Sequence, residues 1–154
     1  MQRNYVLLST IMITILLSSC SKEIAFKPRE INPDIDICTI CNMSVAHIDH
    51  ATEVILDNGE ILTFDDIGCM IEYIESSEEN NTAINKSYVR DIKSNEWIEL
   101  QDAHFAYHQE FWTPMAYGVI SFATKQQAEA YIEEEKKGEL LKYVDLFNHN
   151  WDGF

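Results

Sequence analysis

Basic residues are scarce in this chain of 154 residues. Lys and Arg together number 11 against 26 Asp and Glu, which gives a formal net charge of -15. Proteins bind nucleic-acid backbones through clustered Lys and Arg, and no such cluster occurs here, so we expect no nucleic-acid partner. The five glycines are scattered and form no phosphate-binding loop. No arrangement of residues favours hydrolysis or group transfer, so we do not expect an enzyme.

Hydrophobic residues, in contrast, are plentiful. They make up 46% of the chain, and aromatic residues make up 11%. This content is typical of a chain that buries a core and is well above that of disordered segments. The length is that of one domain or two very small ones.

The N-terminus has the pattern of an export signal. Arg3 stands in a short polar start, and the mainly apolar run that follows is shorter than the roughly 20 residues that span a membrane. Leu17-Ser18-Ser19-Cys20 resembles a bacterial lipobox, which implies cleavage before Cys20 and diacylation of its thiol. An uncleaved anchor helix is the alternative, and both place the chain at a membrane surface.

The chain is thereby divided into three parts. Residues 1–19 are predicted to be a lipoprotein signal peptide, and residues 20–36 a lipidated cysteine with a flexible tether. The tether prediction rests on Pro28, Pro33, many polar residues and the lack of a sustained hydrophobic period. The folded domain is expected to cover residues 37–154.

An internal repeat organises the folded part. Residues 61–75 align without gaps to residues 119–133, and both segments change from a strand pattern to an amphipathic helix. The two halves, about 37–95 and 96–147, each indicate β-β-α-β. Strands and helices in this order favour an α+β fold with two small β-β-α-β halves. The predicted strands are 52–56, 60–64, 87–92, 103–108, 118–122 and 140–146.

Potential metal ligands are most closely spaced where the predicted tether meets the domain. Cys38, Cys41 and Met43 form a Cys-x-x-Cys-x-Met motif. Thiolate and thioether are soft ligands that favour monovalent copper over the hard ions that carboxylates bind. A Cys-x-x-Cys pair also serves disulfides, zinc and redox exchange.

Other sulfur and imidazole groups are further candidates. Met115 lies in a Pro-containing loop that leads into a strand, where a side chain is often presented to a ligand. His104 and His108 share one face of a predicted strand. Cys69, on the flank of the first helix's apolar stripe, is predicted to be a small buried hydrophobe.

Further short segments follow the lipobox and the Cys38-x-x-Cys41-x-Met43 motif in a fixed order. They are Ser44-Val45, the segment 59–66 ending in Phe64-Asp65-Asp66, Val89-Arg90-Asp91 before Trp97-Ile98, Asp102-Ala103, Pro114-Met115 and Ser121-Phe122-Ala123. Together these segments resemble the NosL family of lipoprotein accessory factors for nitrous oxide reductase. The resemblance implies a copper(I) chaperone, lipid-anchored in the bacterial cell envelope and facing the periplasm. It also implies two partners, namely nitrous oxide reductase, whose copper-sulfide site it supplies, and a membrane maturation transporter.

The same resemblance implies a ligand set for copper(I). Cys41 and Met43 correspond to the strongest family positions and Met115 to a further one. Cys38 matches a less uniform position, and His104 follows the family's Asp-Ala pair. The chain also departs from the family, which usually has Gly where this sequence has Asn42 and Ala116.

Three other interpretations stay open at the level of sequence. One is an exported thiol-disulfide oxidoreductase, although the Cys-x-x-Cys pair precedes the first strand and does not begin a helix. Another is a structural zinc site formed by Cys38, Cys41, Cys69 and a histidine. The third is a lipoprotein interaction domain without metal, stapled by a Cys38–Cys41 disulfide.

Overall fold

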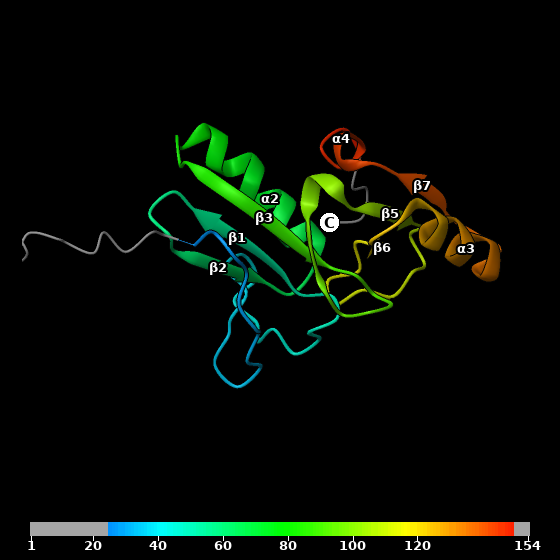
Figure 1. The fold of residues 1–154 in the computed structure, drawn as a ribbon, viewed down its shortest axis with the longest axis horizontal. Coiled ribbons are helices and arrows are strands. Elements are labelled where there is room, and N and C mark those ends of the chain that lie inside the picture. Colours follow the sequence, from blue (N-terminus) through cyan, green and yellow to red (C-terminus); the bar gives the residue numbers. More distant parts are fainter. Residues whose placement is uncertain (1–24, 150–154) are drawn as a thin grey trace, which may run out of the picture.

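The computed structural model describes residues 25–149. The signal segment 1–19 and Cys20 lie outside the described residues. Two small antiparallel sheets, each with a helix, lie next to each other along the chain (Figure 1). Within residues 25–149 no helix has the length and apolar character needed to cross a membrane.

The first sheet has the strand order β2-β1-β3-β4, and every pairing is antiparallel. A turn with Gly59 at φ 85° joins its first two strands, where a residue without a Cβ is favoured. Its elements are β1 (Thr52–Leu56), β2 (Ile61–Phe64), α2 (Ile67–Glu79), β3 (Ile84–Arg90) and β4 (Trp97–Glu99).

The second sheet has the order β6-β5-β7. Thr124 and Gln127 form the capping box that starts its helix, and the left-handed C-cap is Lys136. The elements are η1 (Leu100–Asp102), β5 (His104–Tyr107), β6 (Val119–Phe122), α3 (Lys125–Glu135), β7 (Glu139–Leu141) and α4 (Tyr143–Leu146).

The predicted strand 140–146 is only partly correct. Strand β7 ends at Leu141, and the chain then turns into the short helix α4. Lys142 caps this helix, because its backbone N–H donates to the Asp145 carboxylate at 2.8 Å. A local capping bond therefore overrides the β-branched and aromatic character of the segment.

The two halves share one arrangement, which confirms the α+β fold of two β-β-α-β units. Strands β2 and β6 start 58 residues apart, and so do helices α2 and α3. In both sheets the first strand of the half lies between its second and third strands. The main core cluster contains buried residues of both halves, including Phe64, Met70 and Phe105, so the halves fold onto a common core.

The described part of the predicted tether differs from the prediction, because it packs on the first sheet. The segment 26–36 passes over β1 (Figure 1, blue). Arg29 pairs with Asp36 at 2.6 Å, and its backbone N–H donates to the Glu53 carboxylate at 3.0 Å. The Trp97 indole donates to the Arg29 carbonyl at 3.1 Å. A sheet face that would otherwise be exposed is covered, and we call this segment the strap.

Glu53 is the buried charge beneath the strap. Its side chain is fully buried, and one carboxylate oxygen, Oε1, has no hydrogen-bond partner among the described residues. Burial raises the pKa of Glu53 to about 7, against the opposing effect of the Arg29 N–H bond.

A Glu53→Gln substitution is expected to change how stability depends on pH. Because the folded pKa exceeds the unfolded value, the native state of the wild type loses stability as pH rises toward about 7. The variant lacks this loss. Its free energy of unfolding should therefore exceed that of the wild type by up to about 3 kcal/mol at about pH 8 and by little at about pH 4. Urea unfolding at both pH values measures the difference, and a gain that is equal at both would contradict the explanation.

Candidate metal centre

The loop that carries the Cys-x-x-Cys motif is fixed to the edge of the first sheet. Ile37 and Ser44 form a β-bridge that closes the loop, and the Cys38 N–H donates to the Met43 carbonyl at 2.8 Å. The Thr39 N–H donates to the Thr63 carbonyl on the edge strand β2 at 2.9 Å. The loop therefore follows β2 toward the point where that strand ends and α2 begins.

Three cysteines and one carboxylate meet at this point. The ligand atoms of Cys38, Cys41, Asp65 and Cys69 all lie within 4.8 Å of one another. Cys38, Asp65 and Cys69 are buried, and Cys41 is half-buried. All three described cysteines are free thiols, and the Cys41 thiol donates to the Asp65 carboxylate at 3.5 Å. We call these four residues the thiol cluster.

The thiols of the cluster differ in their acidity. A hydrogen bond from the Cys69 thiol lowers the pKa of Cys38 to about 6, although burial opposes this effect. The same bond, together with burial, raises the pKa of Cys69. Burial also raises the pKa of Cys41 to about 11. In the cluster without metal, Cys38 is therefore the most acidic of the three thiols.

Asp66 connects the cluster to the second half. Its Oδ1 caps α2 by accepting the N–H groups of Gly68 and Cys69 at 2.8 and 3.3 Å. Its Oδ2 accepts the Met115 N–H at 3.0 Å. Tyr117 of the same loop packs on Gly68 so closely that a Cβ there would lie 2.0 Å from the ring. Helix α2 and the Pro114-Met115 loop are thus held together.

The two candidate methionines lie around the thiol cluster in different ways. Met43 is 49% exposed on the cysteine loop. Met115 is half-buried and packs against the core cluster that also includes Cys38 and Cys69. One thioether is therefore open to solvent, and the other is partly enclosed.

The predicted histidine is not among the residues that the structure brings together. On β5, Phe105 joins the core cluster of Cys38 and Cys69, whereas Ala106 joins the cluster beneath α3. His104 alternates with Phe105, so it shares the face of Ala106. His108 contacts Phe111 in a tilted arrangement, with ring centroids 5.6 Å apart.

Sequence reasoning did not place Asp65 in the cluster, and it placed Cys69 there only in the zinc alternative. Cys69 was otherwise expected to be a small buried hydrophobe, and Asp65-Asp66 lies where a helix N-cap is expected. The cap is Asp66 alone. The available signal was the spacing of Asp65 and Cys69, four residues apart across a helix start, which places both side chains near one end of the helix.

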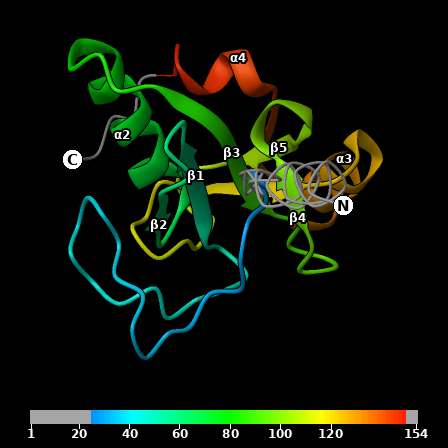
Figure 2. The ribbon, with the colours of Figure 1, turned by 60° about the vertical axis from the view of Figure 1, so that its left-hand side comes forward.

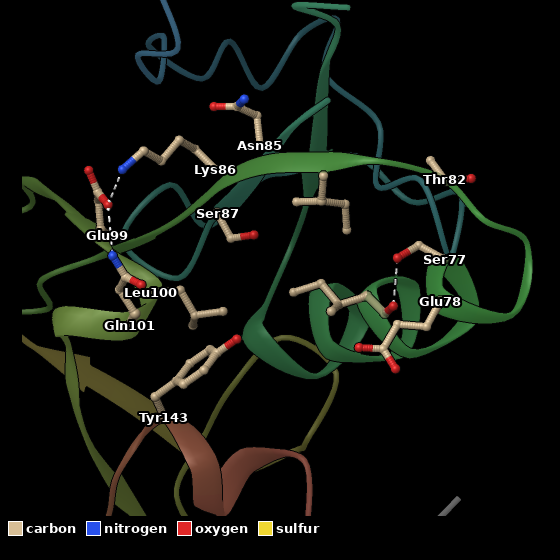
Figure 3. Close-up of a pocket in the computed structure, with 12 residues that line it drawn as sticks. Ser77, Glu78, Thr82, Asn85, Lys86, Ser87, Glu99, Leu100, Gln101 and Tyr143 are labelled. Carbon is tan, nitrogen blue, oxygen red and sulfur yellow. Dashed lines mark hydrogen bonds and ion pairs between the residues drawn. The ribbon is translucent and has the colours of Figure 1, made fainter. Parts of the chain in front are cut away.

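A cavity in another part of the described residues has a different character. It has a volume of about 460 Å³ between α2, β3, η1 and α4 (Figure 3). No Cys, His or Met lines it. Ile74, Ile84 and Leu100 line it together with Tyr143 and the Lys86–Glu99 ion pair. This cavity therefore does not contribute to the thiol cluster.

The fold and the cluster define the class of protein: a two-sheet α+β domain with thiols placed to hold a soft metal. The sequence model of the NosL family matches residues 28–150, so the chain belongs to the NosL family. A search among curated proteins finds no significant match.

Two solved structures show the extent of the likeness. The crystal structure of the copper chaperone NosL from Shewanella denitrificans is similar at a TM-score of 0.63 and 17% identity. The match covers 77% of this chain and 94% of that one, which shows a shared fold. The mercury-bound form of MerB2 matches at a TM-score of 0.43 and 17% identity, over 63% of this chain and 54% of that one. This second score is too low to show a common fold.

The two departures from the family glycines keep the backbone conformation that glycine favours. Asn42 has φ 60° and Ala116 has φ 63°, both in the left-handed region. Asn adopts this region more readily than most residues, whereas Ala does so at a cost of about 1 kcal/mol or more. Strain is therefore expected in the Met115 loop.

An Ala116→Gly substitution is expected to relieve this strain. Because glycine also has a more flexible unfolded chain, the net gain in the free energy of unfolding should be about 0.5–1 kcal/mol. Ala46→Gly is the matched control, since Ala46 is exposed and is not among the positive-φ residues, and it should bring no gain. Urea unfolding of both variants measures the effect. Destabilisation by Ala116→Gly would contradict the strain.

Proposed function

We propose that the chain is a lipid-anchored copper(I) chaperone of the bacterial cell envelope that faces the periplasm. It delivers copper for the maturation of the copper-sulfide site of nitrous oxide reductase. The observation that carries the proposal is the thiol cluster on a NosL-family domain. The similar fold of the copper chaperone NosL from Shewanella denitrificans supports it.

Copper(I) is the cargo of such a site, and the donors fit it. Soft thiolates suit this ion, so Cys38, Cys41 and Cys69 would hold it. The Asp65 carboxylate is a hard donor that suits copper(I) poorly, and it accepts the hydrogen bond of the Cys41 thiol. Its role would then be to orient Cys41.

The graded burial of the donors suits release as well as capture. Cys38 and Cys69 are buried, Cys41 is half-buried and Met43 is exposed. An accepting ligand reaches the metal from the open side, where Cys41 and Met43 lie. If donor and acceptor ligands bind the ion together during transfer, no free copper ion needs to be released. Cys41 and Met43, which the family resemblance implies as copper ligands, would then pass the ion to the acceptor. The buried Cys69 would hold the ion until transfer.

The partners of this exchange are also part of the proposal. Nitrous oxide reductase and its membrane maturation transporter are the expected acceptor and neighbour, as the family membership suggests. Diacylation of Cys20 would confine the exchange to the membrane surface, because two acyl chains anchor a protein there stably.

Zinc is the second candidate for the cluster. Three thiolates and one carboxylate oxygen form a four-donor set that zinc accepts, and Asp65 supplies the oxygen. The sequence reasoning expected a histidine as the fourth zinc ligand, whereas the fourth donor of the thiol cluster is Asp65.

Copper(I) titration against a chromogenic chelator tests the function. The reduced full chain, carrying Cys20→Ser so that only the cluster thiols remain, should bind one copper(I) tightly. Cys41→Ser and Cys69→Ser should each weaken binding by at least about tenfold, and Met43→Leu and Met115→Leu by less. His104→Ala is the control and should bind as the parent does, because His104 shares a sheet face with Ala106 and not with Phe105.

Two results would reject the copper proposal. One is no competition with the chelator by the fully reduced chain. The other is zinc binding that copper(I) cannot displace and that Asp65→Ala abolishes, which would favour the structural zinc site.

Lipidation has a separate test. Cells that express the full chain are labelled with radioactive palmitate, and the chain should carry label and fractionate with membranes. Cys20→Ala should lose the label and accumulate uncleaved, because the acyl acceptor and the cleavage signal are both removed. Equal labelling of the variant would contradict the lipobox interpretation.

A further inference from the structure

Exposed apolar side chains gather beside the thiol cluster. Among residues 25–149, five of the seven large apolar side chains recorded as exposed lie on or against the loop 35–50. The other two, Tyr143 and Val144, are on α4. The loop lies at the edge of the molecule, away from the second sheet (Figure 2, blue to cyan). We call the five residues the rim patch: Ile35, Ile37, Met43, Ile48 and Trp112.

The largest member of the rim patch is held in place. His47 and His50 both meet the Trp112 ring edge to face, with ring centroids 4.8 and 5.4 Å away. The Trp112 side chain is nevertheless 60% exposed. A braced aromatic ring in open solvent loses little conformational entropy on binding, and such residues commonly dominate protein interfaces.

The charge around the rim patch has one sign. Residues 30–85, which include the loop, β1, β2 and α2, contain 13 Asp and Glu and no Lys or Arg. The basic residues of β3, Lys86 and Arg90, are paired with Glu99 and Glu30. Arg29 is paired with Asp36. Lys137, which lies over the Phe111 ring, is paired with Glu110 at 3.0 Å. The unpaired charge that a binding partner would meet around the rim patch is therefore negative.

We propose that the rim patch is the docking surface for a copper-exchanging protein whose contact face joins apolar side chains to Lys or Arg. This inference rests on the proposed function, because Met43 belongs both to the patch and to the open side of the thiol cluster. Apolar contact at the centre and opposite charge around it give affinity and fast association. An anionic membrane surface, the other apolar candidate, would be repelled by the acidic half.

Two synthetic acceptor peptides test the docking surface. Both contain one Cys-x-x-Cys pair with Leu and Phe beside it, and they differ only in flanking Lys or Glu. Stopped-flow measurement with the copper-loaded full chain (Cys20→Ser) gives the rate of transfer. The Lys peptide should accept copper about tenfold faster than the Glu peptide, and added salt should reduce this difference.

Variants locate the effect on the patch. Trp112→Ser and Ile48→Ser should each slow transfer to the Lys peptide by about fivefold while leaving copper affinity unchanged. Val144→Ser, a matched exposed apolar residue on α4, should have no effect. Anisotropy titration of the metal-free chain with Ser-for-Cys peptides measures docking without copper. Failure of copper binding is thereby distinguished from failure of docking.

Three outcomes would overturn the inference. The first is equal transfer to the Lys and Glu peptides. The second is a preference for the Lys peptide that Trp112→Ser and Ile48→Ser leave intact. The net charge of the chain alone would then explain the preference, without a contribution from the rim patch. The third is a Trp112-dependent association of the Cys20→Ser chain with phosphatidylglycerol vesicles stronger than with the Lys peptide, which would make the patch a membrane contact.

Discussion

The carboxylate of Asp66 is the constraint on which the thiol cluster depends. Its side chain is 1% exposed, and burying a carboxylate is costly unless hydrogen bonds replace its water. One oxygen caps α2, and the other accepts the Met115 N–H from the second half. Burial raises the pKa of Asp66 while the bonds from Met115 and Cys69 oppose the rise. The positions of Cys69 and Met115 are thus both fixed by one group.

Local patterns in the sequence were enough to predict most of the fold. The repeat, the hairpin at Gly59 and the start of both helices follow from apolar period, turn chemistry and caps, which act over a few residues. The strap could not be predicted in this way, because residues 26–36 are ordered by Glu53, Tyr88 and Trp97, partners distant in the chain. The strand prediction for residues 143–146 was wrong because a capping bond outweighed strand propensity.

The candidate site was predictable only to the extent that it is local. Cys38, Cys41 and Met43 form a motif that can be read from the sequence. Cys69 and Asp65 join them only because the motif loop lies along β2, so that the end of this strand and the start of α2 meet the loop. That arrangement is tertiary, and no spacing within the motif implies it. For His104, the alternation of side chains along the strand was predicted correctly. The alternation alone does not determine which face of the strand lies toward the thiols.

The repeat shows what the first half has that the second lacks. At the offset of 58, Asp65, Asp66 and Cys69 correspond to Ala123, Thr124 and Gln127. Both junctions join a strand to a capped helix, and in the second half the third helical residue completes a capping box with Thr124. In the first half Asp66 caps the helix alone, which frees that third position for a thiol and leaves Asp65 to face the motif loop. The scaffold therefore needs only a cap at this junction, and the chemistry of the first half comes from side chains that the cap does not require.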